Sequence, residues 1–256
     1  MTYDLQRPSQ RNSTVRSAPD VMLKVSRMST EQPEVFLSIQ GEGISQGTQS
    51  IFLRLALCNL ACTWCDTKYT WDWNQHDYHK EVMELSSEQV SQYISKYACN
   101  HIVITGGEPL IQKRALEPLV RSLKALGYSF EVETNGTILP GTFLEQTVDQ
   151  WNVSPKLANS RNGLTLRNIP KALDRFSQLP NAYFKFVITA LDDIEEVQTL
   201  IRNYQMPKNR VILMPEGTNA EDINEKGKWI AQRCIDEGYR FTTRLHIILW
   251  GDNRGK

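Results

Sequence analysis

Three closely spaced cysteines are the residues of this chain whose types and spacing most clearly suggest chemistry. Cys58, Cys62 and Cys65 have the spacing CxxxCxxC and follow the apolar run at 51–57. A cubane iron–sulfur cluster normally takes four thiolates. Three cysteines so close together would therefore ligate three irons and leave the fourth iron open to a small molecule.

A structural zinc site is the alternative use of the same cysteines, with His76 or His79 as the fourth ligand of a Cys3His set. A zinc knuckle usually brings its second pair of ligands as another tight motif. The two remaining cysteines, Cys99 and Cys234, are isolated and are typical of small buried apolar residues. The spacing therefore favours a cluster, and a non-catalytic zinc-binding protein is the alternative.

Length and charge indicate the class of partner. The chain has 256 residues, the size of one α/β domain of barrel type. Its 29 basic and 29 acidic residues give a formal net charge of zero, so no broad field attracts nucleic acid or an anionic membrane. No apolar stretch reaches the roughly 18 residues of a membrane span. We therefore expect a small-molecule substrate, no nucleic-acid partner and no membrane.

Cysteine usage and the N-terminal composition indicate the compartment and the domain boundaries. Three of the five cysteines lie at 58–65, unlike the paired framework of a secreted disulfide protein. The reducing cytoplasm, which also protects a cluster, is the expected location. Residues 1–30 are rich in Ser, Thr, Gln and Arg, which faintly resembles a transit peptide. Because few apolar residues offset the ordering entropy there, we expect a flexible tail at 1–30 and a single domain at 31–256.

The apolar pattern predicts alternating strands and helices that would position these cysteines. Strands are expected at 35–39, 51–57, 101–105, 128–133, 151–154, 183–188, 210–214 and 241–249. Helices are expected at 90–98, after a capping box of Ser86 and Gln89, and at 116–126, 193–204 and 221–236. This order predicts parallel βα units. Six or seven strands after residue 50 are too few for a closed eight-stranded barrel, so the expected fold is α/β, a partial, laterally open (β/α) barrel.

Several expected strands end in polar or conformationally special residues. These ends are Gly-Gly-Glu-Pro at 106–109, Glu-Thr-Asn-Gly at 133–136, Ser-Pro-Lys at 154–156 and Pro-Glu-Gly at 215–217. His246 lies within the last expected strand. In α/β barrels and open sheets, ligands bind at the carboxyl ends of the strands. The cysteine loop follows its own strand in the same way, so one site is predicted at this edge.

The cysteine motif and the Gly-Gly-Glu run together resemble the radical S-adenosylmethionine enzymes. Glycines let backbone groups approach a ligand closely, and Glu108 can accept a hydrogen bond from an ammonium group. The resemblance implies that S-adenosylmethionine occupies the open iron of a 4Fe–4S cluster and that this run binds its amino group. The cofactor contacts implied are Thr105, Gly106, Gly107, Glu108, Ser154, Lys156, Met214, Pro215 and Glu216.

Arg54 interrupts the apolar strand that precedes the cysteines. An unpaired guanidinium would be costly on a strand that is buried on both faces, so we expect an acidic partner. Two partners are possible. One is a carboxylate of the protein, and the other is a carboxylate of the substrate, which arginine binds through two parallel hydrogen bonds.

A longer set of motifs narrows the resemblance to the 7-carboxy-7-deazaguanine synthases. The set consists of Ser-Ile-Gln-Gly-Glu-Gly at 38–43, Arg54, Cys-Asp-Thr at 65–67, Glu-Thr-Asn-Gly at 133–136 and the segment 246–251. The resemblance covers most of residues 34–251. It implies conversion of 6-carboxy-5,6,7,8-tetrahydropterin to 7-carboxy-7-deazaguanine with loss of ammonia, on the pathway to queuosine. The residues that match the substrate site are Ile39, Gln40, Glu42, Arg54 and His246.

These residue types suit a pterin, whose edge offers both N–H and carbonyl groups. Hydrogen bonds to these donors and acceptors can come from Gln40, from backbone groups near Glu42 and from His246. Arg54 would bind the carboxylate. The alternative for His246 is a core histidine between two apolar neighbours. The family resemblance implies a radical that removes hydrogen from C6, followed by ring contraction and regeneration of S-adenosylmethionine.

The resemblance also implies a magnesium ion, with Thr67 as the matching ligand and Asp66 in the outer shell. Magnesium prefers oxygen ligands and keeps several waters, so one hydroxyl and a substrate carboxylate suffice. Thr67 as a simple turn residue is the alternative. The family further implies a homodimer and an electron donor such as flavodoxin or ferredoxin. Another radical enzyme, such as a glycyl-radical activase, is the alternative within the same chemistry.

Overall fold

A computed structural model describes residues 21–29 and 31–256, which build one curved eleven-stranded sheet. Its order is β11-β10-β9-β8-β7-β6-β4-β1-β2, with β3 paired to β4 and β5 to β1. The strands are β1 Leu23–Ser29, β2 Gln32–Pro33, β3 Val35–Ile39, β4 Gln49–Leu55, β5 Val82–Leu85, β6 His101–Gly106, β7 Ser129–Thr134, β8 Gln150–Val153, β9 Ala182–Ile188, β10 Val211–Pro215 and β11 Arg240–Phe241. The neighbours from β4 through β6 to β11 pair in parallel, which confirms the partial, laterally open barrel.

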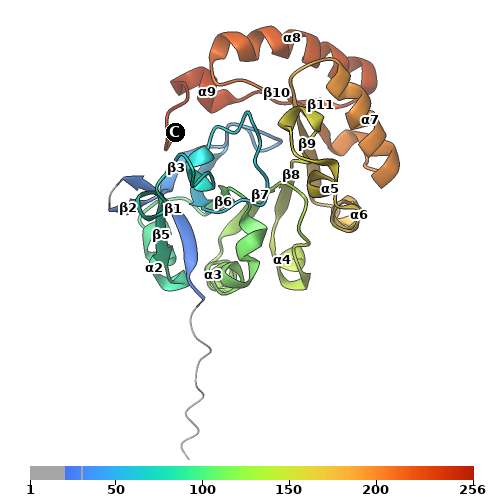
Figure 1. The fold of residues 1–256 in the computed structure, drawn as a ribbon. Coiled ribbons are helices and arrows are strands. Elements are labelled where there is room, and N and C mark those ends of the chain that lie inside the picture. Colours follow the sequence, from blue (N-terminus) through green and yellow to red (C-terminus); the bar gives the residue numbers. More distant parts are fainter. Residues whose placement is uncertain (1–20, 30) are drawn as a thin grey trace, which may run out of the picture.

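Most of the helices cover the outer side of this sheet (Figure 1), whereas α9 lies at the cavity. The helices are α1 Tyr78–Glu81, α2 Ser87–Ile94, α3 Lys113–Ala125, α4 Thr142–Thr147, α5 Leu164–Arg167, α6 Pro170–Gln178, α7 Asp192–Tyr204, α8 Ala220–Glu237 and α9 Leu245–Trp250, with 3-10 turns η1 Lys68–Thr70, η2 Pro109–Gln112, η3 Ala158–Ser160 and η4 Lys208–Arg210. The predicted capping box is confirmed, because Ser86 and Gln89 exchange side-chain to backbone hydrogen bonds at the start of α2. Within the described ranges, no helix is both long and apolar enough to cross a membrane.

Along β4 and β6 to β9, the period of two separates an apolar outer face from an inner face that carries most of the polar side chains, whereas β10 is apolar on both faces. On the outer face, large apolar side chains such as Leu53, Ile104 and Phe184 are fully or almost fully buried and belong to the same core cluster as residues of α3 and α7. The alternate positions line the barrel interior. They include Arg54 on β4 and Lys185 on β9, both of which line a cavity. The sheet therefore buries its core on one side and presents polar groups on the other.

Two glycines hold β6 against the start of the cysteine loop. A Cβ atom on Gly106 would lie 2.0 Å from the Leu55 carbonyl oxygen, and one on Gly107 would lie 2.1 Å from the Leu57 carbonyl oxygen. Gly106 has φ +138°, which side-chain-bearing residues rarely adopt. The Gly107 amide donates to the Leu55 carbonyl at 3.0 Å. Close backbone contact with β4 therefore requires these two glycines, independently of any contact that they make with a ligand.

The expected strand at 241–249 is wrong. Strand β11 ends at Phe241, and Leu245–Trp250 forms helix α9. Apolar residues fill nearly every position from 245 to 250, and such a run does not distinguish a strand from a helix by its period. His246 consequently lies on a helix rather than at the end of a strand.

The expected tail boundary at residue 30 also needs correction. Residues 23–29 form β1, in which Leu23 and Val25 are fully buried. β1 pairs antiparallel with β5 along four residues and with β4 at Val25. These two apolar residues alternate with polar ones, which is typical of a strand, but the pattern is short and lies within a polar segment. Residues 1–20 and 30, the rest of the expected tail, lie outside the described residues.

Candidate active site

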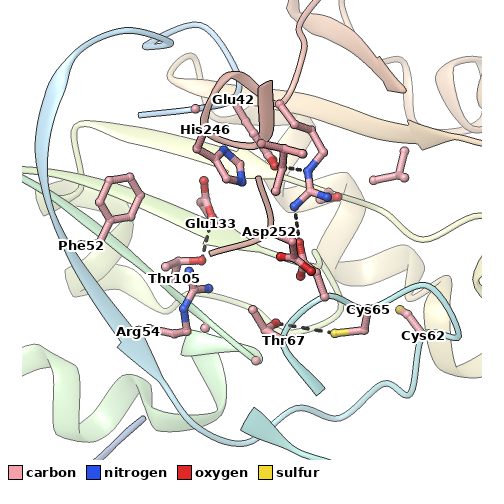
Figure 2. Close-up of a pocket in the computed structure, with 18 of the residues that line it drawn as sticks. Glu42, Phe52, Arg54, Cys62, Cys65, Thr67, Thr105, Glu133, His246 and Asp252 are labelled. Atoms are coloured by element: carbon pink, nitrogen blue, oxygen red, sulfur yellow. Dashed lines mark hydrogen bonds and ion pairs between the residues drawn. The ribbon is translucent and has the colours of Figure 1, made fainter. Parts of the chain in front are cut away.

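A cavity of about 330 Å³ lies at the carboxyl ends of the parallel strands, within the range of about 300–1,000 Å³ that is usual for small-molecule sites. In Figure 2, Arg54 and His246 face a common space, with Cys65 toward its other side. Most residues identified from the sequence line this cavity: Ile39, Gln40, Glu42, Arg54, Cys58, Cys62, Cys65, Thr67, Thr105, Gly106, Gly107, Ser154, Lys156, Met214, Glu216 and His246. Glu108 and Pro215 are not among the lining residues.

The three motif cysteines lie on the loop after β4, and none of them is in a disulfide. Trp71 Nε1 donates to Cys65 Sγ at 3.3 Å, and Asn162 Nδ2 donates to Cys62 Sγ at 3.3 Å. Burial raises the pKa of Cys58 to about 12 and also raises the pKa of Cys62. Such thiols ionise when a metal binds them, and hydrogen bonds to the sulfurs are one way in which proteins tune iron–sulfur clusters. The set therefore fits a cluster held by three thiolates.

The two histidines of the zinc alternative lie elsewhere. The His76 ring packs edge-on to Tyr69 with centroids 6.4 Å apart, and the His79 ring packs edge-on to Tyr78 at 5.5 Å. Neither histidine lines the cavity with the cysteines. In the part of the chain that the structure describes, no three His, Cys, Asp or Glu side chains gather closely enough to hold one metal ion. The positions of the histidines do not support a Cys3His site.

Arg54 has a carboxylate partner within the protein. Its Nε donates to Glu34 Oε1 at 2.8 Å, and the Tyr69 hydroxyl donates to the same oxygen at 3.0 Å. Burial alone would lower the pKa of Arg54, but the charge and hydrogen bond of Glu34, together with Tyr69 and Asp66, outweigh burial and raise it. Among the described residues, no acceptor bonds to the two Nη nitrogens of Arg54. The side chain is therefore a fixed cation at the cavity with two donor groups left for a ligand.

The Gln40 amide is engaged by protein groups. Its Nε2 donates to Glu131 Oε1 at 2.6 Å and to Glu133 Oε1 at 3.2 Å, while its Oε1 accepts from the Glu42 backbone N–H at 3.2 Å. Only 2% of Gln40 is exposed. These bonds fix the turn after β3. Direct contact between this side chain and a substrate stays a prediction.

An ion-pair chain runs along one wall of the cavity and consists of Lys185, Glu42, Arg244 and Asp66. Glu42 forms an ion pair with Lys185, and its Oε1 lies 3.0 Å from Arg244 Nε. Arg244 in turn donates through Nη2 to Asp66. Burial alone would raise the pKa of Glu42, but the two cations lower it well below its usual range. Because Asp66 follows Cys65 directly, this chain joins the cysteine loop to the turn after β3.

His246 reaches the cavity from α9 and packs directly over Gly41. A Cβ atom on Gly41 would lie 2.0 Å from His246 Nδ1, so only glycine leaves room for the ring. Burial lowers the pKa of His246 below its ordinary value of 6.5. The ring is therefore neutral at pH 7, with one nitrogen that donates and one that accepts.

Polar groups of the predicted cofactor site contact one another around the cavity. Thr105 Oγ1 donates to Glu133 Oε2 at 2.7 Å. Lys156 Nζ donates to Ser154 Oγ at 2.8 Å and lies 5.6 Å from the centroid of the Trp64 ring, on the cysteine loop. Lys156 is therefore a cation beside the three thiols.

Glu108 contacts the protein rather than the cavity. Its carboxylate accepts hydrogen bonds from the Leu110 backbone N–H at 3.0 Å, the Thr134 hydroxyl at 2.8 Å and the Asn135 backbone N–H at 2.6 Å. Glu108 is fully buried, and burial raises its pKa. Its bonds hold the end of β7 against η2, and its predicted contact with S-adenosylmethionine stays a prediction.

Several charged residues of the site were missed by reasoning from the sequence: Glu34, Glu131, Lys185 and Arg244. A signal existed for one of them. Lys185 interrupts the apolar run of β9, so the criterion that identified Arg54, a charge within an apolar strand, also applies to it. Glu131 lies in β7, where polar residues alternate with Phe130 and Val132 and no apolar run marks it. Glu34 and Arg244 lie between elements, where no such pattern exists.

Known proteins resemble this chain over most of its length. The family model described as Radical SAM superfamily matches residues 55–230. The 7-carboxy-7-deazaguanine synthase of Pyrobaculum aerophilum is 42% identical, over 87% of this chain and 96% of the relative, and that of Escherichia coli K12 is 32% identical, over 84% and 96%. A crystal structure of QueE from Escherichia coli superposes with a TM-score of 0.67 at 29% identity, over 88% of this chain and 95% of that one. The chain therefore belongs to the radical S-adenosylmethionine superfamily and, within it, to the 7-carboxy-7-deazaguanine synthases.

Proposed function

We propose that the cavity binds 6-carboxy-5,6,7,8-tetrahydropterin and that the protein, a radical S-adenosylmethionine lyase of queuosine biosynthesis, converts it to 7-carboxy-7-deazaguanine and ammonia. The observation that carries this assignment is Arg54, a cation fixed by Glu34 with donors left at the cavity. Family membership supplies the cofactors, a 4Fe–4S cluster and S-adenosylmethionine. When bound, they furnish a carbon-centred radical that removes a hydrogen atom from C6 of the substrate.

The residues of the chain bind and orient the pterin. Arg54 takes its carboxylate through the two Nη groups. The neutral ring of His246 donates one hydrogen bond to the pterin edge or accepts one from it. Ile39, Gln40 and Glu42 form a turn in which Gln40 and Glu42 are held by protein groups. A turn held in one conformation orients the substrate at little entropic cost.

The cofactor side of the cavity is assigned from the family resemblance. We assign to Lys156 a contact with the methionine carboxylate or the ribose of S-adenosylmethionine, and its position beside Ser154 and near Trp64 on the cysteine loop supports this. The other assigned contacts come from the ends of β6 and β10, and they are Thr105, Gly106, Gly107, Glu108, Met214, Pro215 and Glu216.

Magnesium, the electron donor, the oligomer and the compartment complete the proposal. Thr67 lines the cavity two residues after Cys65, which suits a hydroxyl ligand shared with the substrate carboxylate. The family resemblance supports flavodoxin or ferredoxin as the electron donor and a homodimer as the assembly. Cysteine usage supports the cytoplasm, since a cluster needs a reducing compartment.

Equilibrium dialysis of the anaerobic holoprotein tests the substrate assignment. With S-adenosylmethionine and Mg²⁺ present, 6-carboxytetrahydropterin should bind about tenfold or more tightly than tetrahydropterin, because charge-assisted hydrogen bonds contribute about 1.5–3 kcal/mol. Arg54→Ala should weaken binding of the carboxylated pterin and abolish this difference while the iron content stays unchanged. Equal affinity of the unmodified protein for both pterins would refute the assignment.

A further inference from the structure

The segment after α9 returns to the cavity and is anchored by Arg254. The Arg254 guanidinium carbon lies 3.7 Å from the centroid of the Tyr69 ring. Its Nε donates to Glu34 Oε2 at 3.1 Å, its Nη1 donates to Glu81 Oε2 at 3.1 Å, and its Nη2 donates to the Arg27 carbonyl. Each nitrogen of the planar group therefore has an acceptor, and one face stacks on an aromatic ring.

Glu34 joins this anchor to Arg54. One carboxylate oxygen of Glu34 accepts from Arg54 and Tyr69, and the other accepts from Arg254. Glu34 is fully buried, and a buried carboxylate is stable only when such donors surround it. Loss of Arg254 would leave one oxygen without its donor and would free the carboxylate to turn. Arg54, held through its Nε by the same carboxylate, would then lose its fixed direction.

The residues around Arg254 form part of the cavity wall. Asp252, Asn253, Gly255 and Lys256 all line the cavity, together with Arg254 itself. Gly255 packs against β1, because a Cβ atom there would lie 2.6 Å from Met28 Cε. The anchor therefore keeps residues 252–256 beside the same space that Arg54 faces.

We propose that Arg254 is a substrate-positioning residue. Through Glu34 it fixes the direction in which Arg54 presents its Nη groups to the substrate carboxylate, and it holds residues 252–256 as a wall of the cavity. Arg54 touches the substrate, whereas Arg254 acts through Glu34. This inference rests on the proposed function, which makes Arg54 the carboxylate ligand.

Steady-state kinetics of the anaerobic holoenzyme test this role. Arg254→Ala should raise the KM for 6-carboxytetrahydropterin about tenfold or more, with kcat within about twofold of the unmodified enzyme and an unchanged KM for S-adenosylmethionine. Arg254→Lys keeps the charge but loses the planar fork, so its KM should stay about fivefold or more above that of the unmodified enzyme. A pterin KM within about twofold of the unmodified value in Arg254→Ala would overturn the proposal.

The matched control is Arg175→Ala, which removes an arginine ion pair with Glu145 outside the cavity. Its kinetic constants should equal those of the unmodified enzyme. Product formation by the unmodified enzyme is measured first. Absence of 7-carboxy-7-deazaguanine there would overturn the proposed function, whereas product formation with an unaltered KM in Arg254→Ala would overturn only the role of Arg254.

A double-mutant cycle tests whether Arg254 acts through Glu34. Glu34→Gln alone should raise the pterin KM, and the double variant with Arg254→Ala should show less than the product of the two separate increases, because both changes act on one carboxylate. Increases that multiply independently would overturn the coupling. If Glu34→Gln fails to retain iron, Tyr69→Phe replaces it, since that change removes another donor to Glu34.

Discussion

The charges of two cavity side chains, Arg54 and His246, depend on the balance between burial and the charges nearby. Burial disfavours the charged form of both. At Arg54 the carboxylate of Glu34, whose Oε1 lies 2.8 Å from Nε, acts with Tyr69 and Asp66 to outweigh burial and raise the pKa of the guanidinium. At His246 burial prevails over the nearby charge of Glu42, and the pKa falls. At pH 7, Arg54 is therefore a fixed cation at the cavity, and His246 is a neutral ring.

The pKa of His246 implies a pH dependence of stability. Its folded-state pKa lies below 6.5, so the unfolded chain binds a proton that the folded protein does not. The stability contributed by the neutral ring is fully present above about pH 6.5 and is lost as the pH falls toward the folded-state pKa. The urea midpoint of the anaerobic holoprotein should fall between about pH 7.5 and 5.5, and this fall should be smaller in His246→Gln than in the unmodified protein. Identical differences would show that the folded-state pKa is not lowered.

Thr67 gives a prediction about magnesium. Thr67→Ala should raise the Mg²⁺ concentration needed for half-maximal activity about tenfold, since it removes the proposed oxygen ligand. Thr67→Ser keeps the hydroxyl and should stay near the unmodified value. Iron content serves as the control, because Thr67 Oγ1 lies 3.6 Å from Cys65 Sγ. An unchanged Mg²⁺ requirement in Thr67→Ala would contradict the assignment of Thr67 as a magnesium ligand.

At the scale of the element, the parallel strands could be predicted from the sequence, whereas helix α9 and the site residues between elements could not. Apolar runs closed by turn residues predicted β4 and β6 to β10, because a strand covered by helices must be apolar on its outer face. Helix α9 was mistaken for a strand, since a short apolar run has no diagnostic period. Site residues within strands, such as Arg54, stand out against apolar neighbours. Glu34 and Arg244 join the site only through tertiary contacts with residues distant in sequence, Glu34 with Arg54 at 2.8 Å and Arg244 with Glu42 at 3.0 Å. No local pattern encodes such contacts.

The contact between β4 and β6 predicts a large effect at Gly106. Gly106→Ala should destabilise the protein by about 2 kcal/mol or more and lower its iron content, because the added Cβ meets the Leu55 carbonyl oxygen at a strained φ. Gly163→Ala is the control, since its Cβ would meet nothing within 4 Å and its φ is −58°. Urea unfolding of both variants provides the comparison. Equal stability of the two would contradict the close-approach argument.

At the scale of the whole molecule, the open barrel brings distant loops to one cavity. The short stretch from Arg54 to Thr67 supplies the proposed carboxylate ligand, the three thiols and the proposed magnesium ligand. Arg244 ties this stretch to the turn after β3, and Arg254 ties the segment after α9 to Glu34. Two separate sets of ion pairs, one around Glu42 and Arg244 and one around Glu34, therefore hold the loops that line the cavity.

The central claim is that this site carries out ring contraction. The most direct test incubates the anaerobically reconstituted protein with S-adenosylmethionine, a reductant, Mg²⁺ and 6-carboxytetrahydropterin, and identifies the products by mass. We expect 7-carboxy-7-deazaguanine and ammonia in equal amounts, exceeding the S-adenosylmethionine consumed, because that cofactor is regenerated. Cleavage of S-adenosylmethionine without any deazaguanine product would contradict the account.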